Sequence, residues 1–403
     1  MTMIPSRPRL PALTGLRFFA ALYVVLFHLR ASKIAFQSGL VGLIAQLGFT
    51  GVSLFFVLSG FILVYTYQGQ DIPVGKFFRA RFARVYPAYA FSLLLMAHAY
   101  YRSMHLINSP RLAWGAAHPL VSILSVLTLT QSWIPLGATA WNLVAWSLSV
   151  EAFFYAVFPF VLGWLGRRGK SQILTLMVFL WVISLLVSAA YVWLRPDGAG
   201  MLYSSAGNST WLNVVKFNPL VRLPEFLMGM CAGMLFLRNA CPRRLATALV
   251  MGALLGIVVV AWFSPAIPYP LLHTGLLSAV FAALVYGLAL GPSWTNLLKS
   301  RVLVVLGDAS YSLYLLHNFV LTRILERNGH LVHTTVLWIV VAVAAAIALA
   351  IGVHKFIEEP LRHKFNPRRN QSKTTPTRQP EKSSLPYPAS GVLGEPSSSP
   401  ASA

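Results

Sequence analysis

Long apolar segments, separated by short polar stretches, follow one another along almost the whole chain. A helix needs about 20 mostly apolar residues to cross the hydrocarbon core of a bilayer. Segments of about that length lie near 12–29, 45–66, 84–101, 145–165, 172–194, 217–237, 246–264, 271–291, 303–324 and 334–354. A further apolar stretch, 120–129, is shorter and runs into polar residues and Pro135, so it predicts a re-entrant or interfacial piece. The pattern predicts an all-α, polytopic membrane helical bundle of about ten transmembrane helices.

The basic residues predict how this bundle is oriented. With a cytoplasmic N-terminus and ten spans, most Lys and Arg clusters fall on the cytoplasmic side, as the positive-inside rule requires. Counting 120–129 as a span would move every later cluster to the outside. Both termini are therefore predicted to be cytoplasmic, in a multi-pass protein of the cell (inner) membrane. The clusters on the predicted inner face are Arg7 and Arg9; Lys76, Arg79, Arg81 and Arg84; Arg167, Arg168 and Lys170; Arg238, Arg243 and Arg244; Lys299 and Arg301; and Lys355, Arg362, Lys364, Arg368 and Arg369.

Changes in composition predict three regions. Residues 1–11 form a short cytoplasmic N-terminus and 12–365 form the membrane domain. From 366 to 403 the chain is rich in Ser, Pro, Thr and Lys with few large apolar residues, which predicts a disordered cytoplasmic tail.

The overall composition narrows the possible functions. The 403 residues are 57% hydrophobic and only 10% charged, which excludes a soluble domain. The formal net charge of +22 could suggest nucleic-acid binding. However, the basic residues cluster between apolar segments, where they set topology and meet anionic lipid headgroups. Membrane lipids are therefore expected partners and nucleic acid is not, and no cysteine or histidine spacing predicts a metal site.

Two ionisable residues interrupt the first apolar segment. Arg17 and His28 have ten residues between them, so on a helix they are about 1100° and about 16 Å apart and point to nearly the same side. Ionisable groups at bilayer depth are costly and usually mark a site or pathway. This pair favours a membrane enzyme.

Glu151 and Glu225 are the acidic residues that fall inside predicted spans, where carboxylates face the bundle interior and find a partner. Arg222, three residues before Glu225, offers that carboxylate a structural ion pair. Glu151 has no basic neighbour at helical spacing, so its partner must come from another helix. It could equally belong to an active cavity.

Three further groups have both structural and functional interpretations. Ser59 and Gly60 could serve close helix packing or line a narrow cavity. Arg81 and Arg84, three residues apart, could hold phosphate oxygens or anionic lipid. The hydroxyls and imidazole of the 310–317 segment could satisfy one another between helices or line a site; its polar members are Ser310, Tyr311, Ser312, Tyr314 and His317.

Together these fragments resemble the acyltransferase-3 family of integral-membrane acyltransferases, over about nine-tenths of the chain. The matching pieces occur in the family's order. They are Arg17-x10-His28, Phe55-Phe56-Val57-Leu58-Ser59-Gly60-Phe61, Arg81-x2-Arg84-x2-Pro87, Trp146-Ser147-Leu148-Ser149-Val150-Glu151-x2-Phe154-Tyr155, Arg222-x2-Glu225-Phe226-x2-Gly229, Ser310-Tyr311-Ser312-Leu313-Tyr314-Leu315-x-His317 and Glu359-Pro360-x-Arg362.

The resemblance implies a membrane-bound O-acyltransferase. Members acylate surface polysaccharides, lipid-linked glycans, Nod factors or macrolides, usually from acetyl-CoA on the cytoplasmic side. No permanently bound cofactor is implied. Acetyl-CoA or another acyl-CoA would be a co-substrate, and a carbohydrate-containing acceptor would supply the hydroxyl. Longer relatives carry an extracytoplasmic hydrolase-like domain, so the two-domain peptidoglycan type is not expected.

The resemblance also suggests roles for individual residues. Acyl transfer needs a base for the hydroxyl and donors for the oxyanion. His28 is expected to act as base or transient acyl carrier, Arg17 to hold the donor or developing charge, and Glu151 to orient His28 or the acceptor. Arg81 and Arg84 are expected to bind the phosphates of coenzyme A. The remaining cavity-lining candidates are Ser59, Ser147, Tyr155, Glu225, Ser310, Tyr314 and His317.

Two other classes of protein remain as alternatives. A secondary transporter or permease could use the buried Arg, His and Glu as a substrate or proton site. It should show repeat symmetry, which the sequence lacks. A non-catalytic scaffold would tolerate loss of His28.

Overall fold

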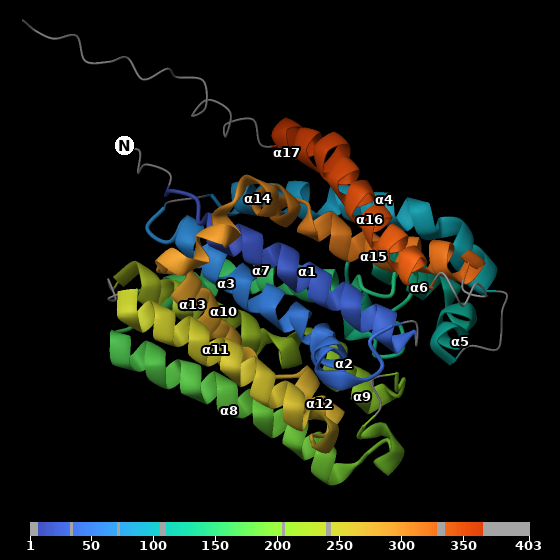
Figure 1. The fold of residues 1–403 in the computed structure, drawn as a ribbon, viewed down its shortest axis with the longest axis horizontal. Coiled ribbons are helices and arrows are strands. Elements are labelled where there is room, and N and C mark those ends of the chain that lie inside the picture. Colours follow the sequence, from blue (N-terminus) through green and yellow to red (C-terminus); the bar gives the residue numbers. More distant parts are fainter. Residues whose placement is uncertain are drawn as a thin grey trace, which may run out of the picture. The chain divides into compact units, whose positions relative to one another are not determined.

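The computed structural model describes residues 7–32, 35–70, 73–104, 110–203, 206–238, 243–328 and 335–365. Within these ranges every regular element is helical, which confirms the all-α prediction. The predicted tail, 366–403, lies outside the described residues. The long helices are α1 (Pro11–Ala31), α3 (Gly51–Tyr67), α4 (Val74–Met104), α7 (Trp146–Gly166), α8 (Lys170–Leu194), α10 (Pro219–Arg238), α11 (Arg243–Phe263), α13 (Ser278–Ala289), α15 (Ser310–Asn328) and α16 (Thr335–Val353) (Figure 1).

Shorter helices cap or connect the long ones. They are α2 (Gly39–Gln46), η1 (Leu47–Thr50), α5 (Pro110–Ala117), α6 (Pro119–Leu127), η2 (Gln131–Trp133), η3 (Ala199–Met201), α9 (Thr210–Phe217), η4 (Ser264–Ala266), α12 (Tyr269–His273), η5 (Ser293–Lys299), α14 (Arg301–Asp308), the π-helical turn η7 (His354–Glu358) and α17 (Glu359–Phe365).

Eight helical segments in the described part of the chain are long and apolar enough to cross a membrane. The predicted spans 84–101 and 303–324 are not among them. The first lies in α4, which also carries the arginines of the basic segment. The second is divided between α14 and α15, which meet at Ala309, so the prediction of one continuous helix there is wrong. The count of about ten spans stays a prediction.

The stretch at 120–129 does not form a long helix. It is the nine-residue helix α6, after which the chain folds back against the start of α7. The Ser132 hydroxyl donates to the carbonyl of Trp146 (2.6 Å), and the Gln131 amide donates to the carbonyl of Ala145 (3.2 Å). These bonds satisfy irregular backbone and buried polar groups inside the protein, as bilayer depth requires.

Helices α3 and α10 pack backbone against backbone in the core. A Cβ on Gly60 would collide with the backbone carbonyl of Phe226, and one on Gly229 with that of Val57. Glycine is therefore needed at both positions to let the two backbones touch, which confirms the packing interpretation of Gly60.

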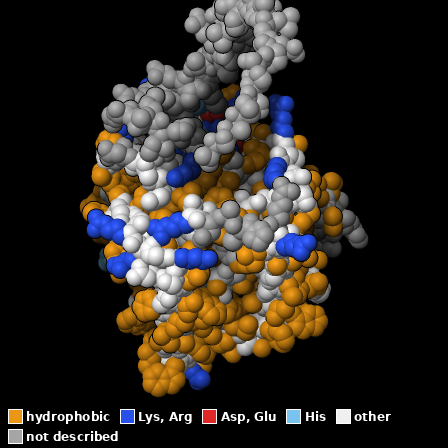
Figure 2. Space-filling model, turned by 90° about the vertical axis from the view of Figure 1, so that its left-hand side faces the viewer, with side chains coloured by type: hydrophobic (Ala, Val, Ile, Leu, Met, Phe, Trp, Pro, Cys, Tyr) orange, Lys and Arg blue, Asp and Glu red, His pale blue; other side chains and the backbone are white. Residues whose placement is uncertain are grey.

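The connections between helices gather at two ends of the bundle (Figure 1). At one end Arg7 donates to the carbonyls of Tyr65 and Gln68, and Arg238 donates to those of Arg168 and Gly166. Figure 2 looks onto this end and shows Lys and Arg side chains spread among apolar ones. The contact of Arg238 with Arg168 joins two of the predicted inner-face clusters. The cytoplasmic location of this end stays a prediction.

The sides of the bundle are apolar. Helices α8, α11 and α16 expose large hydrophobic side chains outward, among them Val178, Leu186, Leu255 and Val336. Exposed apolar surface on long helices suits contact with lipid chains rather than water.

Candidate active site

One cavity lies among α1, α3, α4, α7 and α15 and has an atom-free volume of ≈ 770 Å³, including the part open to solvent. Eight of the predicted site residues line it, together with apolar side chains of α3 and with Tyr311. The eight are Arg17, Ser59, Arg81, Arg84, Ser147, Glu151, Tyr155 and Tyr314. We call this space the arginine cavity. Residues up to 297 positions apart in sequence meet there because five helices each contribute one face.

Three guanidinium groups and one carboxylate give the arginine cavity an excess of positive charge. Arg81 donates to the hydroxyl of Tyr67 (3.1 Å) and lies over the rings of Phe77 and Tyr155. Arg84 forms an ion pair with Glu358 (Nη1–Oε1 3.7 Å). Arg81 and Arg84 are thus each held on one side by the protein while they line the cavity.

Glu151 binds two neighbours through the same carboxylate oxygen. The hydroxyls of Ser59 on α3 and Tyr155 one turn along α7 both donate to Oε1, at 3.1 and 2.5 Å. The partner from another helix is therefore Ser59. The expectation that Glu151 orients His28 or the acceptor stays a prediction.

Hydroxyl groups close one wall of the arginine cavity. Ser147 and Tyr314 share a hydrogen bond of 2.8 Å, and Tyr314 also donates to the carbonyl of Val144 (2.7 Å). Tyr311 donates to the carbonyl of Val85 (2.7 Å). These bonds fix α15 against α4 and α7.

His28 does not line the arginine cavity. Eleven residues beyond Arg17 it lies towards the other end of α1, where its Nδ1 is 2.9 Å from the carbonyl of Val24 and 3.3 Å from Nε2 of His317. His317 is fully buried, and its Nδ1 is 2.8 Å from the carbonyl of Tyr314. The predicted catalytic residues therefore divide, with Arg17 and Glu151 in the cavity and His28 in an imidazole pair beside it.

This histidine pair has a preferred hydrogen-bond arrangement. A carbonyl can only accept, so the ring nitrogen that faces it carries the proton. His317 then donates from Nδ1 and accepts at Nε2, and His28 donates from Nδ1 towards Val24 and His317. In this arrangement the lone pair of His28 is on Nε2, the state that a general base needs.

Two cavity-lining candidates are elsewhere. Glu225 is fully buried in an ion pair with Arg222 (Nη2–Oε2 2.9 Å), as the three-residue spacing allowed. The hydroxyl of Ser310, also fully buried, donates to the carbonyl of Gly307 (2.7 Å). Contrary to the prediction, neither side chain lines the arginine cavity, because Glu225 is turned to Arg222 and Ser310 to Gly307. His317 likewise does not line the arginine cavity, but its ring is 6.3 Å from that of Tyr314, which does.

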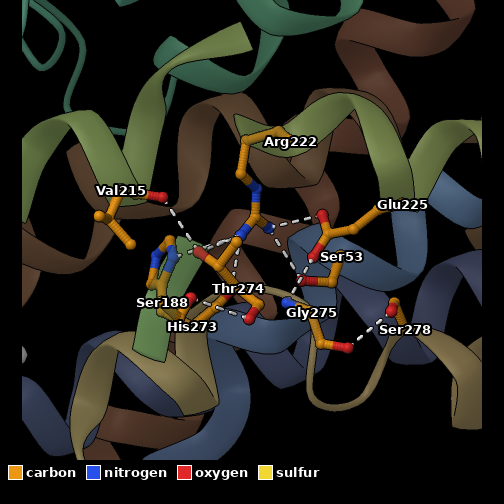
Figure 3. A network of polar contacts seen from close by, with 9 residues as sticks. All are labelled: Ser53, Ser188, Val215, Arg222, Glu225, His273, Thr274, Gly275 and Ser278. Atoms are coloured by element: carbon orange, nitrogen blue, oxygen red, sulfur yellow. Dashed lines mark hydrogen bonds and ion pairs between the residues drawn. The ribbon is translucent and has the colours of Figure 1, made fainter. Parts of the chain in front are cut away.

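The Arg222 guanidinium is the centre of a buried network (Figure 3). It donates to the carbonyl of His273 (2.6 Å) and to the hydroxyls of Thr274 (3.1 Å) and Ser53 (2.8 Å). It also lies over the ring of Phe56, which lines the arginine cavity. The network therefore joins α3, α10 and the break between α12 and α13.

Glu358 was not among the candidate site residues predicted from the sequence. Glu358 is fully buried and also contacts His354 (3.0 Å) and Ser312 (3.4 Å). Its neighbour Glu359, which belongs to the matching motif, is the more exposed of the two. A π-helical turn over 354–358 shifts the helix phase just before this point. The sequence signal near this buried acid was the adjacent motif, Glu359-Pro360-x-Arg362.

A polytopic helical bundle that gathers ionisable and hydroxyl side chains in one cavity among its helices is typical of a membrane protein with a functional site there. The family described as Acyltransferase domain (acyltransferase-3) matches residues 10–355. The chain belongs to this family and is a multi-pass membrane O-acyltransferase.

Several curated proteins are similar. Acyltransferase MdmB of Streptomyces mycarofaciens is 33% identical over 349 residues, which cover 81% of this chain and 82% of that protein. O-acetyltransferase OatA of Staphylococcus aureus is 25% identical, covering 88% of this chain and 57% of OatA. Putative peptidoglycan O-acetyltransferase YrhL of Bacillus subtilis is 29% identical, covering 88% and 55%. The chain thus spans little more than half the length of the latter two. No solved structure matches it significantly.

Proposed function

We propose that this enzyme, in the cell (inner) membrane, moves an acyl group, foremost acetyl, from acyl-CoA to a hydroxyl of a carbohydrate-containing acceptor such as a surface polysaccharide or lipid-linked glycan. The observation that carries the proposal is the convergence of Arg17, Arg81 and Arg84 on one cavity with a single carboxylate, Glu151. Two relatives named O-acetyltransferases support the acetyl group, and the name of YrhL supports a glycan acceptor.

The arginine cavity suits both parts of coenzyme A, the charged phosphates and the uncharged pantetheine arm. Guanidinium groups make paired, charge-assisted hydrogen bonds to phosphate oxygens. Arg81 and Arg84 lie within one helix turn near the start of α4, in the basic segment of the predicted cytoplasmic face. The apolar stretch of α3 between Val52 and Leu63 offers a lining for the uncharged pantetheine arm. Arg17 is placed to bind the donor or stabilise the oxyanion.

His28 serves as the base in this proposal. The acceptor oxygen attacks the thioester carbonyl, its proton passes to the imidazole, and the carbon–sulfur bond breaks as the ester forms. The imidazolium then returns the proton to the departing thiolate of coenzyme A. The histidine pair adjoins the cavity wall, since the His317 ring is 6.3 Å from that of Tyr314, which lines the arginine cavity.

The test is acyl transfer by the purified protein in nanodiscs, with Arg84→Ala, His28→Ala and the control Arg79→Ala. Arg79 is exposed on the same helix and does not line the cavity. Losing one charge-assisted contact, worth about 1.5–3 kcal/mol, should weaken acetyl-CoA binding about 10- to 150-fold in Arg84→Ala. His28→Ala should bind the donor normally and lose turnover.

Two results would contradict the proposal. If Arg79→Ala and Arg84→Ala weaken donor binding equally, the arginine cavity does not hold the phosphates. If the wild type neither binds nor consumes acetyl-CoA or other acyl-CoAs, the donor is a different activated acyl compound.

A further inference from the structure

A second cavity lies at the other end of α1 and has an atom-free volume of ≈ 900 Å³. The last turn of α1, α2, η1 and the segment from η4 to α12 form its walls, and Tyr203 adds a side chain from the η3 connection. It shares no lining residue with the arginine cavity. We call it the outer cavity, after the predicted orientation of the chain.

The outer cavity combines aromatic rings with fixed polar groups. Phe49 packs edge-on against Phe27 (5.3 Å between centroids) and Tyr269 (4.9 Å), and all three line the space. Arg30 is held by the carbonyl of Phe36 and by Gln46, whose Oε1 accepts from Nη2 at 3.1 Å. The polar side chains are thus oriented before any ligand arrives.

This mixture matches the chemistry of a sugar. A pyranose ring presents apolar C–H faces, which suit aromatic rings, and a rim of hydroxyls that both donate and accept. Amide and guanidinium groups supply the complementary donors and acceptors. The outer cavity has one guanidinium, Arg30, whereas the arginine cavity has three. A ligand with several phosphates requires more positive charge than Arg30 supplies, so it suits the arginine cavity and not the outer cavity.

One layer of side chains separates the two cavities. Phe49 lines the outer cavity and Val52, three residues on and about 4.5 Å further along the helix axis, lines the arginine cavity. The Phe49 ring stacks on His273 (5.3 Å, 12°), which accepts from Arg222 in the network of Figure 3.

The histidine pair belongs to the same layer. Phe27 lines the outer cavity and its ring is 5.2 Å from that of His28, which is 4.9 Å from that of His317. His317 in turn faces Tyr314 of the arginine cavity. His28 lines neither cavity but has ring neighbours on both sides, Phe27 towards the outer cavity and His317 towards Tyr314.

We infer that the outer cavity binds a sugar unit of the acceptor, with the hydroxyl to be acylated directed towards the layer that contains His28. The inference rests on the proposed function for its purpose, but the binding of sugar there can be measured without any acyl transfer.

The experiment compares Ala31→Trp with Ser32→Trp. Ala31 lines the outer cavity at the end of α1, whereas Ser32 is equally exposed and does not line it. Three readouts apply: the shift of Tm caused by coenzyme A, transfer from acetyl-CoA to tetrasaccharides of glucose, galactose or N-acetylglucosamine, and maleimide labelling of Ala31→Cys in a Cys241→Ser background. Glycerol at equal mass concentration is the control for the sugars.

Filling the cavity should lower transfer by Ala31→Trp about tenfold or more, with Ser32→Trp near wild type and the coenzyme A shift unchanged in both. At a sugar concentration equal to Kd, half of the cavities are filled, so labelling of Ala31→Cys should fall about twofold. Glycerol should leave the labelling rate unchanged.

The inference is overturned if none of the sugars slows labelling, or if Ala31→Trp transfers to a sugar as fast as Ser32→Trp. Protection by sugar without a coenzyme A shift would support the outer cavity and contradict the acyl-CoA donor. A shift of Tm with coenzyme A, without protection of Ala31→Cys by sugar, would support the acyl-CoA donor and contradict the outer cavity. The two failures are therefore distinguishable.

Discussion

The ion pair between Arg222 and Glu225 offers the sharpest test of the structure, because it is buried among helices from three parts of the chain. Both side chains are at most 1% exposed, and their charged atoms are 2.9 Å apart. Apart from Arg222, Glu225 has the Ser53 hydroxyl and the backbone N–H of Gly275 (3.4 Å) as described hydrogen-bond donors. Removing the guanidinium therefore leaves a buried carboxylate with two neutral donors and no counterion.

The expected cost follows from this arrangement. Breaking a buried ion pair by removing one partner typically costs about 3–5 kcal/mol, because a charge stays buried without its counterion. Arg222→Met should fall in this range, as should Glu225→Leu. The double variant buries no unpaired charge and loses mainly the hydrogen bonds from Arg222, each worth about 1 kcal/mol. It should therefore be more stable than the sum of the single changes by about 3 kcal/mol or more, at the upper end of the coupling found for residues in one network.

The assay is reversible unfolding in mixed detergent micelles, measured for the wild type, both single variants and the double variant. Arg79→Met, on the exposed face of α4, controls for loss of an arginine and should stay close to wild type. Strict additivity of the two single changes would refute the reasoning, because it would mean that the two side chains do not interact.

Two further predictions concern packing and the histidine pair. Gly229→Val should lower the free energy of unfolding by about 1–3 kcal/mol or more, because its Cβ would meet the Val57 carbonyl; Gly163→Ala, with open space around it, should be neutral in the same unfolding assay. His317→Leu should lower kcat at least about tenfold with KM for acyl-CoA unchanged, because His28 loses the acceptor that orients it, and His317→Gln should restore part of kcat. Equal kcat in the leucine and glutamine variants would show that His317 only fills space.

Local sequence patterns predicted much of this protein correctly. Apolar segment lengths gave the helical membrane bundle, and the short stretch at 120–129 was recognised as too short to span. The three-residue spacing of Arg222 and Glu225 predicted their ion pair. These features depend on helix geometry and on the low polarity of the bilayer, which act on neighbouring residues.

The arrangement of the site needed the tertiary structure. Helical periodicity aligned Arg17 with His28, yet it could not tell that another helix would bring His317 to His28 while Glu151 turned to Ser59. These contacts join residues 92 to 289 positions apart. Their formation depends on which helix faces meet, and no local pattern encodes that.

The sequence by itself therefore determined the class of fold, the family and most of the polar residues that line the arginine cavity. Only the tertiary structure decided that Glu225 and Ser310 are bound away from the arginine cavity, that Glu358 pairs with Arg84, and that an outer cavity adjoins Phe27, the ring neighbour of His28. The physical reason is that residue type and spacing fix what a helix can bury, whereas helix packing fixes which buried groups meet and where space is left between them.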